Sequence, residues 1–199
     1  MRLECIFAKS KNGVIGNKWK MPWPRNVEDL EKLKNKINPK SNEEAYICLM
    51  WRGTYETMKD YFPKAKKKWY PYARKTIVLS GSMEDEEWIE VFHSVPEFLQ
   101  KYKYTDELIM VLGWAATIES LAKYISKARI TTFPEEYEWD TFAPHLPQWY
   151  IWEDREYLDN RDEKYKDSKL KHEVWTPITD PTSRYILEVC GHEKQYTQK

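Results

Sequence analysis

Apolar runs of strand length alternate with helical segments along the chain, and this alternation limits the possible fold more than any other feature. The predicted strands are Leu3–Lys9, Ala45–Met50, Thr76–Ser80, Trp88–Phe92, Glu107–Leu112 and Lys127–Phe133. The predicted helices are Asn26–Ile37, one starting at Thr54, Val95–Tyr102, and one from Gly113 to about Tyr124. This order predicts an α/β fold with a mostly parallel, twisted central sheet and flanking helices. Two closing strands, His172–Ile178 and Arg184–Cys190, predict an antiparallel C-terminal edge.

The 199 residues are expected to form a single domain, residues 1–199, because no internal repeat or linker divides them. The stretch 153–171 is almost entirely charged, with both signs mixed. This stretch is expected to be exposed, and helical or disordered, within a charged insertion at about 146–170, and a short tail, 192–199, is expected at the C-terminus.

The composition excludes several classes of partner. The 32 basic residues balance the 32 acidic ones, which argues against nucleic acid and against an anionic membrane. The N-terminus does not resemble a signal peptide, and no apolar run approaches the ~18 residues of a membrane span. Cys5, Cys48 and Cys190 lack metal-ligand spacing and lie in apolar runs, so we expect buried free thiols in a reducing cytosol and no metal site. We therefore expect a cytoplasmic protein, and a monomer.

The segment 12–30 carries the strongest functional pattern. Pro22 and Pro24 keep the chain around Trp23 out of a helix. Asn26 is a suitable N-cap, so Asp29 lies in the first turn of the helix that follows. A half-buried carboxylate there can hold a flat heterocycle through two parallel hydrogen bonds to its amine and ring N–H. Taken alone, however, Asp29 is better explained as a first-turn charge.

Motifs in the same order and spacing resemble those of dihydrofolate reductases over residues 1 to about 190. The matching segments are Val14-Ile15-Gly16, Met21-Pro22-Trp23, Asp29-Leu30, Trp51-Arg-Gly-Thr-Tyr-Glu56 for the family's Met-Gly-Arg-x-Thr-Trp-Glu, Pro71-Tyr-Ala-Arg74 for Pro-x-x-Arg, and Trp139-Asp-Thr-Phe-Ala-Pro144 for Gly-Asp-Thr-x-x-Pro. The resemblance implies hydride transfer from NADPH to dihydrofolate, giving tetrahydrofolate.

The resemblance also implies a set of residues on the folate side. Asp29 would bind the pterin, Thr131 would orient Asp29, and Trp23 would hold the water that delivers a proton. The substrate would further contact Ile6, Phe7, Leu33, Met58, Leu112 and, through the carboxylate of its glutamate tail, Arg74. Glu28 is the rival of Asp29 for the pterin, but the distance from Trp23 and the pairing with Leu30 favour Asp29.

On the cofactor side, the resemblance implies contacts between NADPH and residues that follow the strands. These are Ala8, Ile15, Gly16, Arg52, Gly53, Thr54, Ser80, Gly113, Trp114, Ala115 and Thr117. Thr54 lies at a helix N-terminus, which suits an anion such as a phosphate.

Three departures from the family pattern concern this cofactor groove. Trp51 and Trp114 stand where the family has glycine, and Ala116 stands where it often has a basic residue. One alternative is therefore a catalytically impaired reductase-like binding or structural protein. A second alternative is a related pyrimidine or pterin reductase, against which Arg74 argues because only a glutamylated substrate needs it.

Overall fold

The computed structural model describes residues 1–16, 20–37, 46–61, 73–86, 89–146, 150–153 and 168–177. The predicted strand Arg184–Cys190, the tail 192–199 and most of the predicted charged insertion lie outside these residues.

The central sheet has eight strands, and six of them run parallel. In sheet order they are β5 (Ile89–Phe92), β4 (Lys75–Leu79), β3 (Ile47–Trp51), β6 (Leu108–Leu112), β1 (Arg2–Ser10), β7 (Ile125–Phe133), β10 (Lys171–Pro177) and β9 (Tyr150–Glu153). β10 is antiparallel to β7, and β9 is antiparallel to β10. The predicted α/β fold is confirmed, with an antiparallel side that contains β9 as well as β10.

An early part of the region predicted as a charged insertion belongs to the central sheet. Tyr150–Glu153 forms β9 and pairs with Val174–Pro177 of β10, and Leu170 is buried. The apolar residues Ile151 and Trp152 favour a strand. They directly precede a highly charged stretch, with which the sequence-based prediction grouped them.

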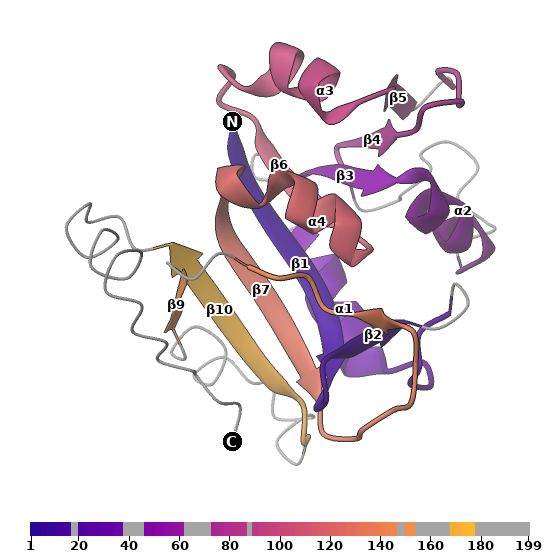
Figure 1. Cartoon of the computed structure of the whole chain (residues 1–199), viewed down its shortest axis with the longest axis vertical. Helices are drawn as coiled ribbons and strands as arrows, with labels where there is room; N and C mark the ends of the chain where they lie inside the picture. The colour runs from indigo at the N-terminus through magenta and orange to yellow at the C-terminus, as the bar shows by residue number, and fades with distance from the viewer. Residues whose placement is uncertain are drawn as a thin grey trace.

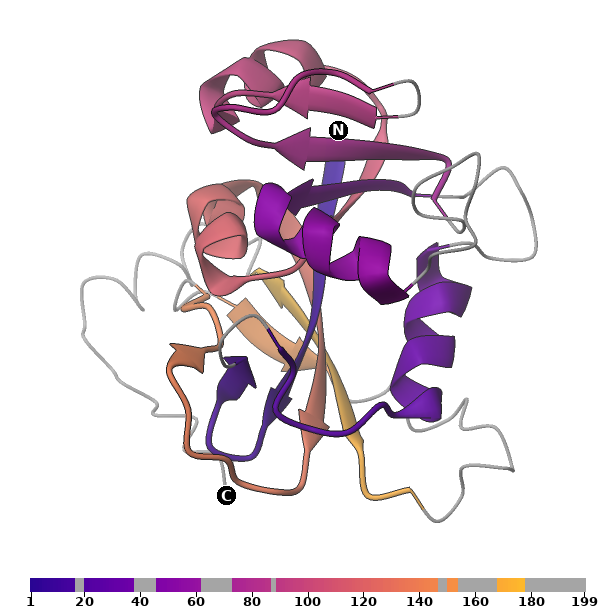
Figure 2. The same ribbon diagram turned by 90° about the vertical axis from the view of Figure 1, so that its right-hand side faces the viewer.

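Helices cover both faces of the sheet. They are α1 (Val27–Ile37), α2 (Arg52–Tyr61), α3 (Val95–Tyr102), α4 (Ala115–Leu121) and the short 3-10 helix η2 (Ala122–Tyr124). α4 lies in front of the sheet in Figure 1 and α1 lies behind it, and Figure 2 separates the same two helices on opposite sides. Within the described residues, none of the helices combines the length and the apolar character that a membrane crossing requires.

Side-chain alternation along the strands builds one apolar core on each face. One core joins Leu3, Cys5 and Val111 to Phe98 of α3 and Ile118 of α4. The other core joins strand residues of the opposite parity to α1 and α2; it comprises Cys48, Met50, Val78, Met110 and Leu112 with Ile37 and Tyr55. Cys5 and Cys48 are buried free thiols, as the sequence predicts, while Cys190 lies outside the described residues.

The loop after β1 is tied to the segment that follows β7. β2 (Val14–Gly16) pairs with β8 (Thr141–Phe142), and the amide of Ala143 donates to the carbonyl of Gly13 at 2.8 Å. The Asn12 side chain adds two bonds, because it donates to the Tyr137 carbonyl at 2.8 Å and accepts from the Tyr137 amide at 3.2 Å. These contacts hold Gly16 in place beside the carboxyl ends of the parallel strands.

Candidate active site

Asp29 lies in the first turn of α1, as its N-cap predicts. The backbone amide of Asp29 donates to Oδ1 of Asn26 at 3.0 Å, which fixes the start of the helix. The Asp29 carboxylate is hydrogen-bonded by the Thr131 hydroxyl from β7. Burial raises the pKa of Asp29 to about 6; the hydrogen bond from Thr131 acts in the opposite direction, and the nearby charge of Glu28 adds to the rise. A carboxylate of this kind changes charge close to neutral pH.

Glu28, the rival acid, faces a different partner. Its side chain is only 4 % exposed, and its Oε1 lies 3.2 Å from Nε2 of His172 on β10. Lys32, one turn further along α1, brings its Nζ to 3.6 Å from the same oxygen. Glu28 is therefore used within the fold, and Asp29 is the better placed of the two for a ligand.

Apolar side chains predicted to contact the substrate come from several elements on one face of the sheet. Ile6, Leu33 and Met58 pack against one core that includes Leu112. Ile6 and Leu112 are paired in the register of β1 and β6. Phe7, which the resemblance placed with this group, packs instead against the core on the opposite face. The reason is the period of two along β1, which gives Phe7 the same direction as Cys5.

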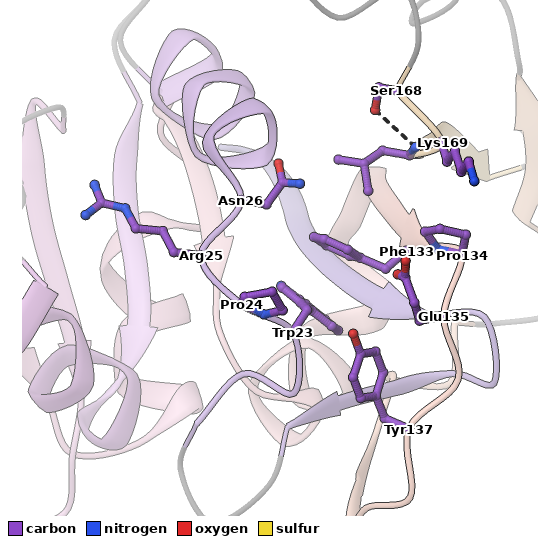
Figure 3. Close-up of a pocket in the computed structure, with 11 residues that line it drawn as sticks. Trp23, Pro24, Arg25, Asn26, Phe133, Pro134, Glu135, Tyr137, Ser168 and Lys169 are labelled. Atoms are coloured by element: carbon purple, nitrogen blue, oxygen red, sulfur yellow. Dashed lines mark hydrogen bonds between the residues drawn. The ribbon is translucent and has the colours of Figure 1, made fainter.

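Trp23 lies in the segment just before α1, on one side of the site. Its ring is 6 % exposed and stacks on Phe133, with ring centroids 4.3 Å apart and 15° between the planes. Tyr137 meets the same ring at an angle, with centroids 6.3 Å apart. These aromatic rings line a hollow of about 420 Å³, together with Asn26 and Leu170. Figure 3 shows how Trp23, Phe133 and Tyr137 lie around it. The hollow lies beside Trp23 and does not include Asp29 among its lining residues.

The turn between β6 and α4 touches the first turn of α2. Gly113 has φ +108°, and a Cβ added to it would lie 2.1 Å from Oγ1 of Thr54. The Oγ1 atoms of Thr54 and Thr117 are buried and lack a hydrogen-bond partner within the described part of the chain. Buried hydroxyls are normally paired, so two unpaired ones at the same edge of the sheet suit a polar ligand.

Arg52 and Ser80 both contact Ser82, whose backbone amide donates to Oγ of Ser80 at 3.4 Å. Nη1 of Arg52 donates to Oγ of Ser82 at 3.0 Å, and its Nε donates to Oε1 of Glu56 at 2.7 Å. Ser80 is buried, and its Oγ accepts from the amide of Met83 at 3.1 Å. The hydroxyl of Ser80 is therefore engaged in a turn, while the guanidinium of Arg52 remains half-exposed.

Trp51 and Trp114, the two tryptophans that the resemblance predicts at the cofactor groove, are placed differently. Trp51, at the end of β3, is 45 % exposed. Trp114 precedes α4 and lies against Gly16, where an added Cβ would be 2.4 Å from Cζ3 of the indole. The Gly113–Trp114 peptide is trans, in line with every peptide bond of the described residues. Trp114 thus rests on the loop after β1, next to Ile15.

We expect Gly16→Ala to destabilise the protein by about 1–2 kcal/mol, because the new methyl group must displace the indole of Trp114. In a Trp114→Gly background, the same substitution should cost less than about 0.5 kcal/mol. Urea unfolding of the parent, the two single variants and the double variant, followed by circular dichroism, gives the coupling free energy between positions 16 and 114. Equal costs in both backgrounds would show that the contact with Trp114 does not limit position 16.

Arg74 is occupied by another side chain. Its Nη2 forms an ion pair with Oε2 of Glu107, and both groups are partly exposed. The Arg74 amide also donates to the carbonyl of Tyr46 at 3.0 Å. A carboxylate ligand at Arg74 would have to share the guanidinium with Glu107 or replace it. The presence of Arg74 is therefore a weaker argument for a glutamylated substrate than the motif alone suggests.

His172 is a polar residue beside Thr131 that no sequence pattern indicates. This side chain is 4 % exposed and lies between Glu28 and Thr131. Glu28 and His172 are 144 residues apart, and no local pattern links them. Only the placement of β10 beside β7 and under α1 brings them together.

Comparisons with known proteins agree on one family. The sequence model described as dihydrofolate reductase matches residues 2–174. The chain is 31% identical over 152 residues to the dihydrofolate reductase of Buchnera aphidicola, covering 76% of this chain and 84% of that protein. It is 29% identical over 147 residues to dihydrofolate reductase type 1 of Escherichia coli, covering 74% and 84%. Among solved structures, a dihydrofolate reductase from Enterococcus faecalis complexed with NADP(H) and RAB-propyl has a TM-score of 0.64 at 24% identity, covering 90% of this chain and 97% of that one.

Proposed function

Because this chain belongs to the dihydrofolate reductase family, we propose that it reduces 7,8-dihydrofolate to tetrahydrofolate with NADPH as the hydride donor. The observation that carries the proposal is the Asp29 carboxylate, which the Thr131 hydroxyl holds by a hydrogen bond and whose pKa burial raises to about 6. We place this activity in the cytoplasm and assign it to a monomer.

On the substrate side, Asp29 accepts hydrogen bonds from the pterin amino group and ring N–H. Ionised Asp29 also stabilises a pterin that carries a proton on the nitrogen next to the reacting carbon. Thr131 keeps the carboxylate oriented, and the backbone carbonyls of Ile6 and Leu112 take the remaining amino hydrogens. Leu33 and Met58 exclude water from the flat face of the ring, which strengthens the contact with Asp29.

Because we assign Asp29 to the amino group and ring N–H of the pterin, a water molecule would deliver the proton to the acceptor nitrogen. Trp23 is the residue we assign to hold that water. Its stacking on Phe133 fixes the position of the indole, which a positioning role requires.

The residues of the groove fit a dinucleotide. Thr54 and Thr117 offer two buried hydroxyls that lack partners among the described residues, and Gly113 lets the backbone come close to them. These groups would hold the pyrophosphate, with Arg52 and Ser82 near the adenosine phosphate. When bound, NADPH supplies the hydride, and the protein supplies orientation and a dry pocket. Ala8 packs against the cluster of Trp23, Phe133 and Leu170. We assign Ala8, Ile15 and Gly16 to contacts with the nicotinamide.

One observation favours a second candidate, a reductase-like protein that binds folate but turns over poorly. Trp114 lies against Gly16, one of the residues that we propose to contact the nicotinamide. If the indole stays there, NADPH binding is weakened while the pterin site around Asp29 remains intact.

We expect the purified protein to oxidise NADPH only when dihydrofolate is present. The measurement is NADPH absorbance over time, with an Asp29→Asn protein purified in parallel to exclude a contaminating reductase. Turnover in the parent and a large loss in the variant would support the reductase. A folded parent without turnover would refute it, and calorimetric titration with folate and with NADPH would then identify the folate binder.

A further inference from the structure

Four side chains form a continuous polar chain beneath the pterin site. Oε1 of Glu28 lies 3.2 Å from Nε2 of His172, and Nδ1 of His172 lies 3.1 Å from Oγ1 of Thr131. The Thr131 hydroxyl in turn hydrogen-bonds Asp29. Glu28, His172 and Thr131 are all less than 8 % exposed. The two acids come from α1, while Thr131 and His172 face each other across the β7–β10 pair.

The number of protons in this chain decides which contacts can be hydrogen bonds. A carboxylate only accepts, a hydroxyl has one proton to donate, and a neutral imidazole has one N–H. If Asp29 and Glu28 are both ionised and His172 is neutral, three contacts must share two protons, and one contact stays without a hydrogen. A single additional proton completes all three.

That proton has two positions with the same total charge. In the first, Asp29 is ionised, Thr131 donates to it, and a protonated His172 donates to both Thr131 and Glu28. In the second, Asp29 is protonated and donates to Thr131, Thr131 donates to Nδ1, and His172 donates only to Glu28. The two forms interconvert when the Nδ1 proton moves to Oγ1 of Thr131 and the hydroxyl proton moves to Asp29. No proton is exchanged with solvent.

We propose that His172, paired with Glu28, is a positioning residue that shares one proton with Asp29 through the Thr131 hydroxyl and so sets the charge of the pterin-binding carboxylate. The effect on the reaction rests on the function proposed above, whereas the shared proton is a property of the free protein.

The charges around the imidazole support this arrangement. On α1, Glu28 and Asp29 both favour a protonated His172, and Lys32 partly offsets Glu28 at 3.6 Å. The net charge that α1 presents to the imidazole is therefore negative.

The sheet contributes charges that are largely paired with one another. Arg129, on the same face of β7 as Thr131, pairs with Glu4 of β1 at 3.1 Å. On the opposite face, Lys171 lies 2.8 Å from Glu173, and Lys9 interacts with both of them. Of the charged groups named here, Glu28 is the one in direct contact with the imidazole, at 3.2 Å.

The test is a pH titration of the free protein by NMR, with the His172 ring and the Asp29 carboxyl carbon observed together. Two groups that share a proton titrate in common steps, so each signal should show two inflections in the parent. In Asp29→Asn, His172 should titrate in a single step with a midpoint lower by about one pH unit or more, because an attracting charge is gone. Glu28→Gln should lower the same midpoint.

Glu173→Gln is the matched control, since it removes a neighbouring carboxylate of β10 that faces the other side of the sheet. It should leave both inflections of His172 in place. Single-step titration of His172 at the same midpoint in the parent and in Asp29→Asn would overturn the proposal. If Asp29→Asn and Glu28→Gln do not fold, His172→Gln serves instead, and Asp29 should then titrate in one step.

Kinetics give the second readout. His172→Gln should move the midpoint of the pH profile of single-turnover hydride transfer, and Glu173→Gln should not. An unchanged midpoint in His172→Gln would also count against the proposal. If the parent shows no hydride transfer at any pH, the proposed function fails, and the NMR titration alone decides whether the proton is shared.

Discussion

Replacing Asp29 with asparagine lowers kcat/KM for dihydrofolate by roughly a hundred- to several-thousand-fold at neutral pH. The amide keeps the size of the side chain but loses its charge, and its NH2 group faces an N–H of the pterin. Breaking a desolvated charge pair in this way costs about 3–5 kcal/mol, which corresponds to that range of rates. Steady-state kinetics with saturating NADPH measures the loss.

The same substitution stabilises the free protein at high pH. The pKa of Asp29 is raised to about 6 in the folded state from an ordinary value of 3.8. A raised pKa gives stability that is present below pH ~4 and is lost as the pH rises through ~6. At pH 8 Asp29 is ionised, and its burial lowers the free energy of unfolding by the full amount. The Asp29→Asn variant should therefore have a free energy of unfolding about 1–3 kcal/mol higher than the parent, measured by urea unfolding. The gain should shrink as the pH is lowered through 6.

Asp106→Asn is the control for both measurements, because this acid is exposed before β6. It should change neither kcat/KM nor stability by a measurable amount. A variant at position 29 that lost activity and stability together would point to a structural role for the carboxylate, contrary to the site described above.

Replacing Gly113 with alanine should destabilise the protein by about 3–5 kcal/mol. The backbone at Gly113 has φ +108°, where a residue with a Cβ is strained by about 1–3 kcal/mol. The added Cβ would also lie 2.1 Å from Oγ1 and 2.9 Å from Cβ of Thr54, and the forced shift of α2 adds a similar cost. The free energy of unfolding of a native domain is only about 5–15 kcal/mol, so the midpoint of urea unfolding should fall strongly.

Gly13→Ala separates the two causes. Gly13 has φ +83°, but an added Cβ there would meet no atom within 4 Å. It should therefore cost only the conformational part, about 1–2 kcal/mol. If alanine at Gly13 and at Gly113 lowers the free energy of unfolding equally, the contact with Thr54 does not contribute to the destabilisation at Gly113.

Local signals account for the parts of the fold that the sequence predicts well. Ser94 caps α3, with the Glu97 amide donating to its hydroxyl at 3.3 Å, and the helix spans Val95–Tyr102 as predicted. Asn26 marks the start of α1 in the same way. Phe7 shows the opposite case, because the motif match placed it with the pterin although its parity with Cys5 along β1 already assigned it to the other face.

Contacts between distant segments account for what the sequence does not predict. The departure at Trp114 is visible in the motif, but its contact with Gly16 depends on how the loop after β1 is tied down. The pairing of β9 with β10 is likewise decided by the sheet edge available to it. In the same way, His172 looks like an ordinary strand residue until β10 is placed beside Thr131.

The 144 residues between Glu28 and His172 also bear on how the sequence can diverge. Losing either partner alone deprives a buried ionisable group of this contact, so the two positions are coupled in their effect on fitness. Chimeras that take the N-terminal part from this chain and the C-terminal strands from a relative lacking the histidine would separate the pair. A chimera with its crossover after β10 would keep both Glu28 and His172 from this chain, which makes that junction the safer one for recombination.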